Sequence, residues 1–186
     1  LTVAERVAVI AIHRGANGAV TGISTDRGNC SAPIVVNAAG TWGGEIAKLA
    51  NVHLPLLPRR GFILVTQPLG QRIHHKVYTA EYLLNVASDN AGLETSTVVE
   101  GTRAGTVLIG ASRERVGFDR TPNPLALSKL ARGAIELFPF LADVKLLRSY
   151  FGFRPYCPDH LPVIGADPRR SEEHTSELQS RLHLVC

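Results

Sequence analysis

The residues best suited to chemistry lie in one extended segment, residues 150–165 (YFGFRPYCPDHLPVIG). Side chains alternate between the two faces of a strand, so Phe151 and Phe153 share one face and are expected in the core. The opposite face carries four polar side chains: Arg148, Tyr150, Arg154 and Tyr156. A guanidinium fork beside phenol hydroxyls is what recognition of a carboxylate requires. The segment therefore predicts a site for a small carboxylate-bearing substrate, with Arg154, Tyr150 and Tyr156 as its contacts, in preference to a solvent-facing strand edge.

A second segment, residues 35–42 (VVNAAGTW), offers bare backbone. A short apolar strand over residues 33–37, of the kind buried on both faces of a parallel sheet, runs into Ala38, Ala39 and Gly40. Without bulky side chains, a ligand such as a dinucleotide can approach the peptide groups closely. A tight strand-to-helix turn chosen for packing is the equal alternative. Thr41 is the expected N-cap of the helix that follows, and Trp42 is expected to anchor that helix in the core, the alternative being a wall of a ligand cavity.

The run GASRERVGFDR, residues 110–120, has two interpretations. It is either a charged, solvated bend or a segment that places Arg113 or Glu114 near a pocket. Adjacent His74 and His75 point to opposite faces of an extended segment, so they cannot jointly bind one metal ion.

The spacing of the cysteines and the distribution of charge argue against several kinds of site. The three cysteines, Cys30, Cys157 and Cys186, stand far apart without a CxxC pair, which argues against a disulfide framework, a zinc site or an iron–sulfur site. We therefore predict no metal site and a cytoplasmic location. The net charge of +4 is spread without a Lys/Arg run, so nucleic-acid binding is not expected. No apolar stretch approaches the length of a membrane span, and no signal peptide is visible.

The two ends of the sequence are unusual. The chain contains no methionine, which indicates a trimmed start or a fragment. The string RSEEHTSELQS, which opens residues 170–186, resembles a translated sequencing adapter, and we expect residues 170–186 to be a non-native tail. The alternative is an ordinary solvated helix, because Glu177 and Arg181 stand at an i,i+4 spacing.

The expected elements form a mixed α/β (α+β) chain. Two β-branched runs, residues 7–12 and 19–25, predict a hairpin around the Gly-rich turn between them. Strands are expected at 62–67, 76–88 (broken somewhere), 106–110 and 146–156 of an antiparallel sheet. Asn123 is expected to cap a helix with Pro124 at its first position, which Pro139 ends. Its expected apolar stripe is Leu127, Leu130, Ala131, Ala134 and Phe138.

Four motifs taken in order resemble the FAD-dependent D-amino-acid oxidase family: VVNAAGTW, RGFILVT (residues 60–66), VLIGASRERVGFD (residues 107–119) and GFRPYCPDHLPVIG (residues 152–165). Within it, the resemblance is to the branch of glycine oxidase, D-amino-acid dehydrogenase and hydroxyproline or opine dehydrogenase. The resemblance implies a partial Rossmann-type FAD-binding domain (1–58), an antiparallel-sheet substrate domain (59–156) and a return to the FAD domain (157–169).

The resemblance also implies a chemistry: hydride transfer from the α-carbon of a small amino or imino acid to the flavin. Residue by residue, Arg154 matches the family arginine that binds the substrate carboxylate. The positions that match the FAD site are Val9, Ala38, Ala39, Gly40, Trp42, Arg60 and Gly61.

The family's opening GxGxxG and its closing Gly-rich segment are absent here. We therefore expect the isolated chain to bind FAD poorly and to be inactive alone. The alternatives are an FAD-dependent 2-hydroxy-acid oxidoreductase, since Arg154 would hold either carboxylate, and a non-catalytic fragment or subunit of a heteromeric dehydrogenase with partner subunits.

Overall fold

The computed structural model describes residues 2–86, 88–166 and 182–185 and divides into two compact units. Unit 1 comprises residues 1–57 and 155–186, and unit 2 comprises residues 58–154. Part of the predicted tail, residues 170–181 and 186, lies outside the described residues, and residues 182–185 form a strand.

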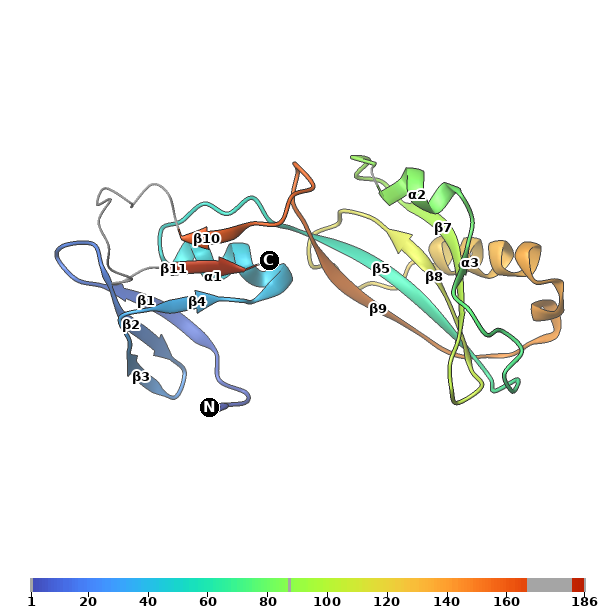
Figure 1. The fold of residues 1–186 in the computed structure, drawn as a ribbon, viewed down its shortest axis with the longest axis horizontal. Coiled ribbons are helices and arrows are strands. Elements are labelled where there is room, and N and C mark those ends of the chain that lie inside the picture. The colour runs from blue at the N-terminus through green and yellow to red at the C-terminus, as the bar shows by residue number, and fades with distance from the viewer. Residues whose placement is uncertain (1, 87, 167–181, 186) are drawn as a thin grey trace. The chain divides into compact units, whose positions relative to one another are not determined.

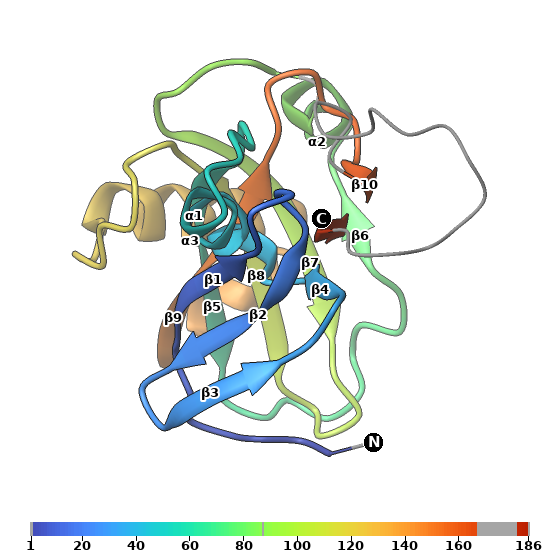
Figure 2. The ribbon, with the colours of Figure 1, turned by 90° about the vertical axis from the view of Figure 1, so that its left-hand side faces the viewer.

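Unit 1 contains two small sheets and a short helix (Figure 1). The predicted hairpin is present as β1 and β2, which pair antiparallel, and β3 completes the first sheet (Figure 2). The second sheet has the order β10–β11–β4, with β11 parallel to β4. Its elements are β1 (Val9–Arg14), β2 (Val20–Thr25), β3 (Gly28–Ser31), β4 (Val35–Asn37), η1 (Gly40–Trp42), α1 (Gly43–Leu49), β10 (Ile164–Ala166) and β11 (Leu182–Val185).

Three sequence predictions in unit 1 are wrong. The strand β4 is not buried on both faces, because Val36 is 57% exposed. Thr41 does not cap α1, since a 3-10 turn comes first and places Trp42 at the N-cap position without a side-chain cap bond. The Trp42 side chain is 50% exposed and is not part of the core. The core of unit 1 is built instead from aliphatic side chains: Ile12, Val20, Ala47, Ala50, Val52, Leu54 and Leu56.

Unit 2 is built on one large sheet of five strands in the order β6–β7–β8–β5–β9. The pairs β6/β7, β7/β8 and β5/β8 are antiparallel, as the sequence predicts for this part of the chain. Its elements are β5 (Leu57–Thr66), β6 (Val77–Tyr78), α2 (Glu81–Val86), β7 (Glu94–Gly101), β8 (Val107–Arg113), α3 (Pro124–Leu137), η2 (Pro139–Asp143) and β9 (Leu146–Tyr156).

The helix α3 packs on one face of the large sheet against β7 and β8 (Figure 1). As predicted, Asn123 caps it by accepting a hydrogen bond from the N–H of Ala126, with Pro124 in the first turn. Leu130 and Ala134 from the predicted stripe are fully buried there. We call this side of the sheet the covered face. Its core comprises Phe62, Leu64, Ile73, Val99, Val107, Ile109, Ala126, Leu130, Ala134 and Leu141.

The sequence prediction for residues 76–88 is largely wrong, because only Val77–Tyr78 is a strand there and α2 follows. The N–H groups of Tyr82 and Leu83 donate to the carbonyls of Thr79 and Ala80, which starts a helical turn. Asn85 then anchors α2 to β7, since its amide donates to the carbonyl of Thr95. Alanine, glutamate and leucine favour a helix here, and this tertiary bond fixes it.

Candidate functional site

Side chains of the edge strand β9 point alternately to the two faces of the large sheet. The ring of Phe151 lies 5.7 Å from that of Phe62, between centroids, and so belongs to the covered face. Phe153 lies 5.8 Å from Phe151 on the same side, so the predicted alternation is confirmed for this pair. Arg154 follows Phe153 directly and therefore points to the opposite side, which we call the open face.

Arg154 is exposed on the open face. In the part of the chain that the structure describes, its guanidinium makes no hydrogen bond and no ion pair. Its positive charge nevertheless affects the pKa of two other cations. Burial lowers the pKa of Arg113, and the charge of Arg154 adds to that effect. The hydrogen bond to Glu100 raises the pKa of Lys76, and the charge of Arg154 opposes that rise. Arg154 therefore has a free donor fork in a region of positive potential.

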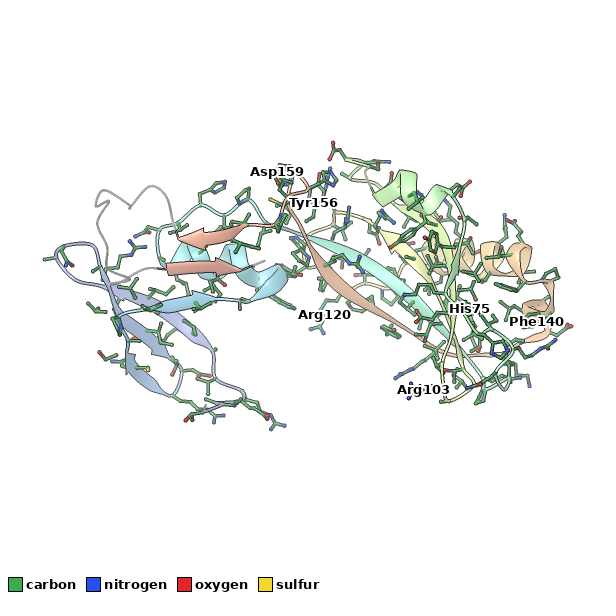
Figure 3. The ribbon with its side chains drawn as sticks, viewed as in Figure 1. His75, Arg103, Arg120, Phe140, Tyr156 and Asp159 are labelled. Atoms are coloured by element: carbon green, nitrogen blue, oxygen red, sulfur yellow. The ribbon has the colours of Figure 1, made fainter. Side chains whose placement is uncertain are left out.

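The two tyrosines predicted beside Arg154 differ in their surroundings. Tyr150 is exposed, and its ring lies 5.8 Å from the guanidinium carbon of Arg148. Tyr156 is only 5% exposed and belongs to unit 1, where its ring packs edge-on against His160 at 5.5 Å. Figure 3 shows Tyr156 and Asp159 together at the turn after β9. The alternation argument predicts one face for all of these side chains, but strand β9 passes from one unit into the other before it reaches Tyr156.

Asp159 stabilises the turn that follows β9, as its Pro-rich sequence context indicates. Its Oδ1 accepts a hydrogen bond of 3.0 Å from the N–H of Leu161. A hydrogen bond from Cys157, followed by that from Leu161, lowers the pKa of the Asp159 carboxyl. The carboxylate is thus committed to the local backbone.

Arg113, at the end of β8, is a buried cation whose guanidinium makes no hydrogen bond with the described residues. It is 7% exposed, and its Nη1 atom is buried and makes no hydrogen bond with the described residues. Its guanidinium carbon lies 5.6 Å from the ring centroid of Tyr82 on α2, and Glu94 is its register partner on β7. Burial lowers the pKa of Arg113, an effect that the charge of Glu94 opposes. Of the two interpretations of residues 110–120, the solvated bend is wrong for this residue.

Glu114, the next residue, points to the covered face and forms a buried ion pair with Arg60. The distance from Arg60 Nη2 to Glu114 Oε1 is 2.9 Å, and the side chains are 4% and 7% exposed. Arg60 Nη1 also donates to Asp119 Oδ2 at 2.8 Å and to the carbonyl of Thr121 at 2.8 Å. All three nitrogens of this guanidinium are therefore engaged within unit 2.

Gly61 allows the strands beside this ion pair to approach closely. A Cβ at position 61 would lie 2.5 Å from the carbonyl oxygen of Ser112. Arg60 and Gly61 thus have packing reasons for their identity, and their predicted place beside a flavin stays a prediction.

The loop after β4 in unit 1 exposes backbone, as the sequence indicates. The buried amide of Asn37 donates to the carbonyl of Gly43 at 2.8 Å and accepts from the N–H of Ala39 at 3.2 Å. The loop is thereby clamped while Ala38 stays exposed. Gly40 has a positive φ of 54°, and open space lies where a Cβ would stand. Sequence reasoning missed the role of Asn37, although an asparagine between an apolar strand and an Ala-Ala-Gly turn is the available signal.

The described residues contain no group of three or more His, Cys, Asp or Glu side chains placed to hold a metal ion. No helix among residues 2–86, 88–166 and 182–185 combines the length and the apolar character that a membrane crossing needs.

Comparison with known proteins gives consistent matches. A family model described as "DAO: FAD dependent oxidoreductase" matches residues 1–186. Glycine oxidase from Pseudomonas aeruginosa is 34% identical over 149 residues, which cover 80% of this chain and 37% of that protein. Hydrogen cyanide synthase subunit HcnC from Pseudomonas protegens is 31% identical over 83% of this chain and 33% of that protein. The chain thus spans about a third of the length of these curated relatives.

Among solved structures, L-proline dehydrogenase from P. horikoshii superposes with a TM-score of 0.78 at 22% identity. The match covers 97% of this chain and 44% of the dehydrogenase chain. This likeness confirms the predicted mixed α/β fold with its antiparallel sheet.

Proposed function

The chain belongs to the DAO family of FAD-dependent oxidoreductases, and we propose that the whole protein oxidises a small amino or imino acid. The bond oxidised is that between the α-carbon and nitrogen, with hydride leaving the α-carbon. The observation that carries the proposal is Arg154, an exposed guanidinium on an edge strand with no ion pair among the described residues. Such a fork binds a carboxylate through two parallel N–H donors.

Arg154 positions the substrate by its carboxylate. A bidentate pair fixes the orientation of the acid as well as its location, so the α-carbon is held in one direction relative to the sheet. Tyr150 shares the face but contacts Arg148, and no hydrogen bond joins it to Arg154 in the described chain. We therefore assign the carboxylate to Arg154 first, with Tyr150 as a wall of the site.

The loop of residues 38–40 fits the backbone approach that FAD binding needs, because Gly40 has open space at its missing Cβ and Ala38 is exposed. Ala38, Ala39 and Gly40 would hold part of the cofactor. The resemblance adds Val9, which begins β1, and the half-exposed Trp42. Bound FAD would supply the hydride acceptor, and the protein would supply binding and orientation.

The test uses the whole protein loaded with FAD. Anaerobic addition of glycine, sarcosine, D-alanine or L-proline is expected to bleach the flavin absorbance with at least one of them. Arg154→Lys is expected to lower kcat/KM at least tenfold, about 1.4 kcal/mol, because lysine cannot form the bidentate pair. The matched control is Arg103→Lys, an exposed arginine in the turn between β7 and β8 (Figure 3), which should leave kcat/KM unchanged.

Three outcomes overturn the proposal. If only a 2-hydroxy acid such as glycolate bleaches the flavin, the substrate is a hydroxy acid. If no small acid bleaches it, the proposed reaction is wrong. If Arg154→Lys behaves like Arg103→Lys, the carboxylate site is elsewhere.

A further inference from the structure

Three cations share the open face of the large sheet, and we call them the cationic cluster: Lys76 directly before β6, Arg113 at the end of β8 and Arg154 on β9. Lys76 is neutralised, because its Nζ lies 2.8 Å from Glu100 Oε2. Arg113 and Arg154 have no ion-pair partner within the described residues. The charge of Glu94 opposes part of the charge of Arg113, but two guanidinium groups without an ion pair on one face still favour an anionic ligand.

Arg113 is the more informative of the two, because it is buried. Leaving a buried hydrogen-bonding group unsatisfied costs about 1–3 kcal/mol, and more when the group is charged. An exposed arginine such as Arg154 avoids that cost through water. The Nη1 atom of Arg113 is buried and has no hydrogen-bond partner among the described residues, so the fold retains a donor that these residues do not use.

The neighbouring acid does not satisfy this donor. Glu94 is the register partner of Arg113, but its Oε1 accepts a hydrogen bond of 2.6 Å from Ser88, and its buried Oε2 has no partner among the described residues. No ion pair within 4.0 Å joins Glu94 to Arg113. The Tyr82 ring lies over the guanidinium instead.

We propose that the open face binds a substrate with two acidic groups, an amino or imino dicarboxylate, with one carboxylate on Arg154 and the second on Arg113. This inference rests on the proposed function, which assigns the first carboxylate to Arg154. The second carboxylate supplies the hydrogen-bond acceptor that the Nη1 atom of Arg113 lacks among the described residues. A charge-assisted pair of this kind discriminates strongly between acids with and without the second group, because the unmatched cation stays unsatisfied.

The experiment compares diacids and monoacids on the FAD-loaded whole protein. The substrates are iminodiacetate and D-aspartate against glycine and D-alanine, with kcat/KM from flavin reduction. Binding of malonate and acetate by calorimetry gives a readout independent of turnover. The wild type is expected to favour the diacid at least tenfold in both measurements. Arg113→Met is expected to lower that diacid-to-monoacid ratio at least tenfold.

Control variants separate the two proposals. Arg103→Met should change neither ratio nor rate, and Arg113→Gln, checked by thermal melting, serves if Arg113→Met does not fold. If no acid of either kind bleaches the flavin, the proposed function fails. If monoacids are oxidised in an Arg154-dependent way while the ratio ignores Arg113, the function stands and the second carboxylate site is wrong. Equal binding of malonate and acetate likewise overturns the inference and leaves Nη1 to a buried water molecule.

Discussion

The two faces of the large sheet each bury an arginine, but in opposite ways. On the covered face, Arg60 is 4% exposed and bonds two carboxylates and two backbone carbonyls. On the open face, Arg113 is 7% exposed and its guanidinium makes no hydrogen bond with the described residues. The residue type and the burial are the same, and only the partners differ.

This difference teaches that burial alone does not indicate what a charged side chain does. A buried guanidinium whose donors are all matched holds the fold together, because removing it would strand its partners. A buried guanidinium with an unmatched donor costs free energy in the folded chain. We therefore infer a structural role for Arg60 and a ligand-binding role for Arg113.

The largest effect is expected for Arg60→Met. The substitution leaves the buried carboxylate of Glu114 without its cation, and breaking a buried pair in this way costs about 3–5 kcal/mol in the free energy of unfolding. Urea unfolding followed by circular dichroism measures the loss. A loss below about 1 kcal/mol would show that the Arg60 network contributes little and would remove the contrast between the faces.

A much smaller effect is expected for the same substitution on the other face, Arg113→Met. Methionine fills a similar volume without an unsatisfied donor, but it also removes the charge that faces Glu94. Because these two effects oppose each other, the free energy of unfolding should change by less than about 1 kcal/mol. The same urea titration measures it. A loss above about 2 kcal/mol would instead make Arg113 a structural residue like Arg60.

The smallest effect is expected at Asp119, at the exposed end of the Arg60 network. Hydrogen bonds from the N–H and hydroxyl of Thr121, with a contribution from Arg60, lower the pKa of its carboxyl. Because the pKa is lower in the folded chain, the carboxylate stabilises the fold above its unfolded pKa of about 4. That contribution is lost as the pH falls through the folded pKa.

Asp119→Asn should therefore flatten the pH dependence of stability below about pH 5. Urea titrations at several pH values, with Asp143→Asn in η2 as the exposed control, measure it. An unchanged slope in Asp119→Asn relative to wild type would show that Asp119 is not linked to folding.

Local signals predicted the elements whose determinants are close in sequence. The hairpin of β1 and β2 follows from two β-branched runs around a Gly-rich turn. The start of α3 follows from Asn123 and Pro124. The strand β7 was not predicted, because Thr, Ser and Glu dominate its first half, and its place in the sheet comes from pairing on both sides.

The candidate site, too, was predicted only where its determinants are close in sequence. Alternation along one strand placed Arg154 opposite Phe153 without any knowledge of the neighbours. The same argument could not separate Arg113 from Glu114, because the partner of Glu114 is Arg60, 54 residues away. Nor could it foresee that Tyr156 is buried in unit 1. Long-range partners decide which polar side chains remain available.

The N-cap residue of α3 also links the helix to the large sheet. Asn123 Oδ1 accepts from the first turn of the helix, while its Nδ2 donates to Glu114 Oε2 at 3.2 Å. Glu114 in turn holds Arg60 on β5. Amide protons in α3 and in the centre of the sheet should consequently exchange with solvent through one shared opening event, so that helix and sheet behave as a single foldon.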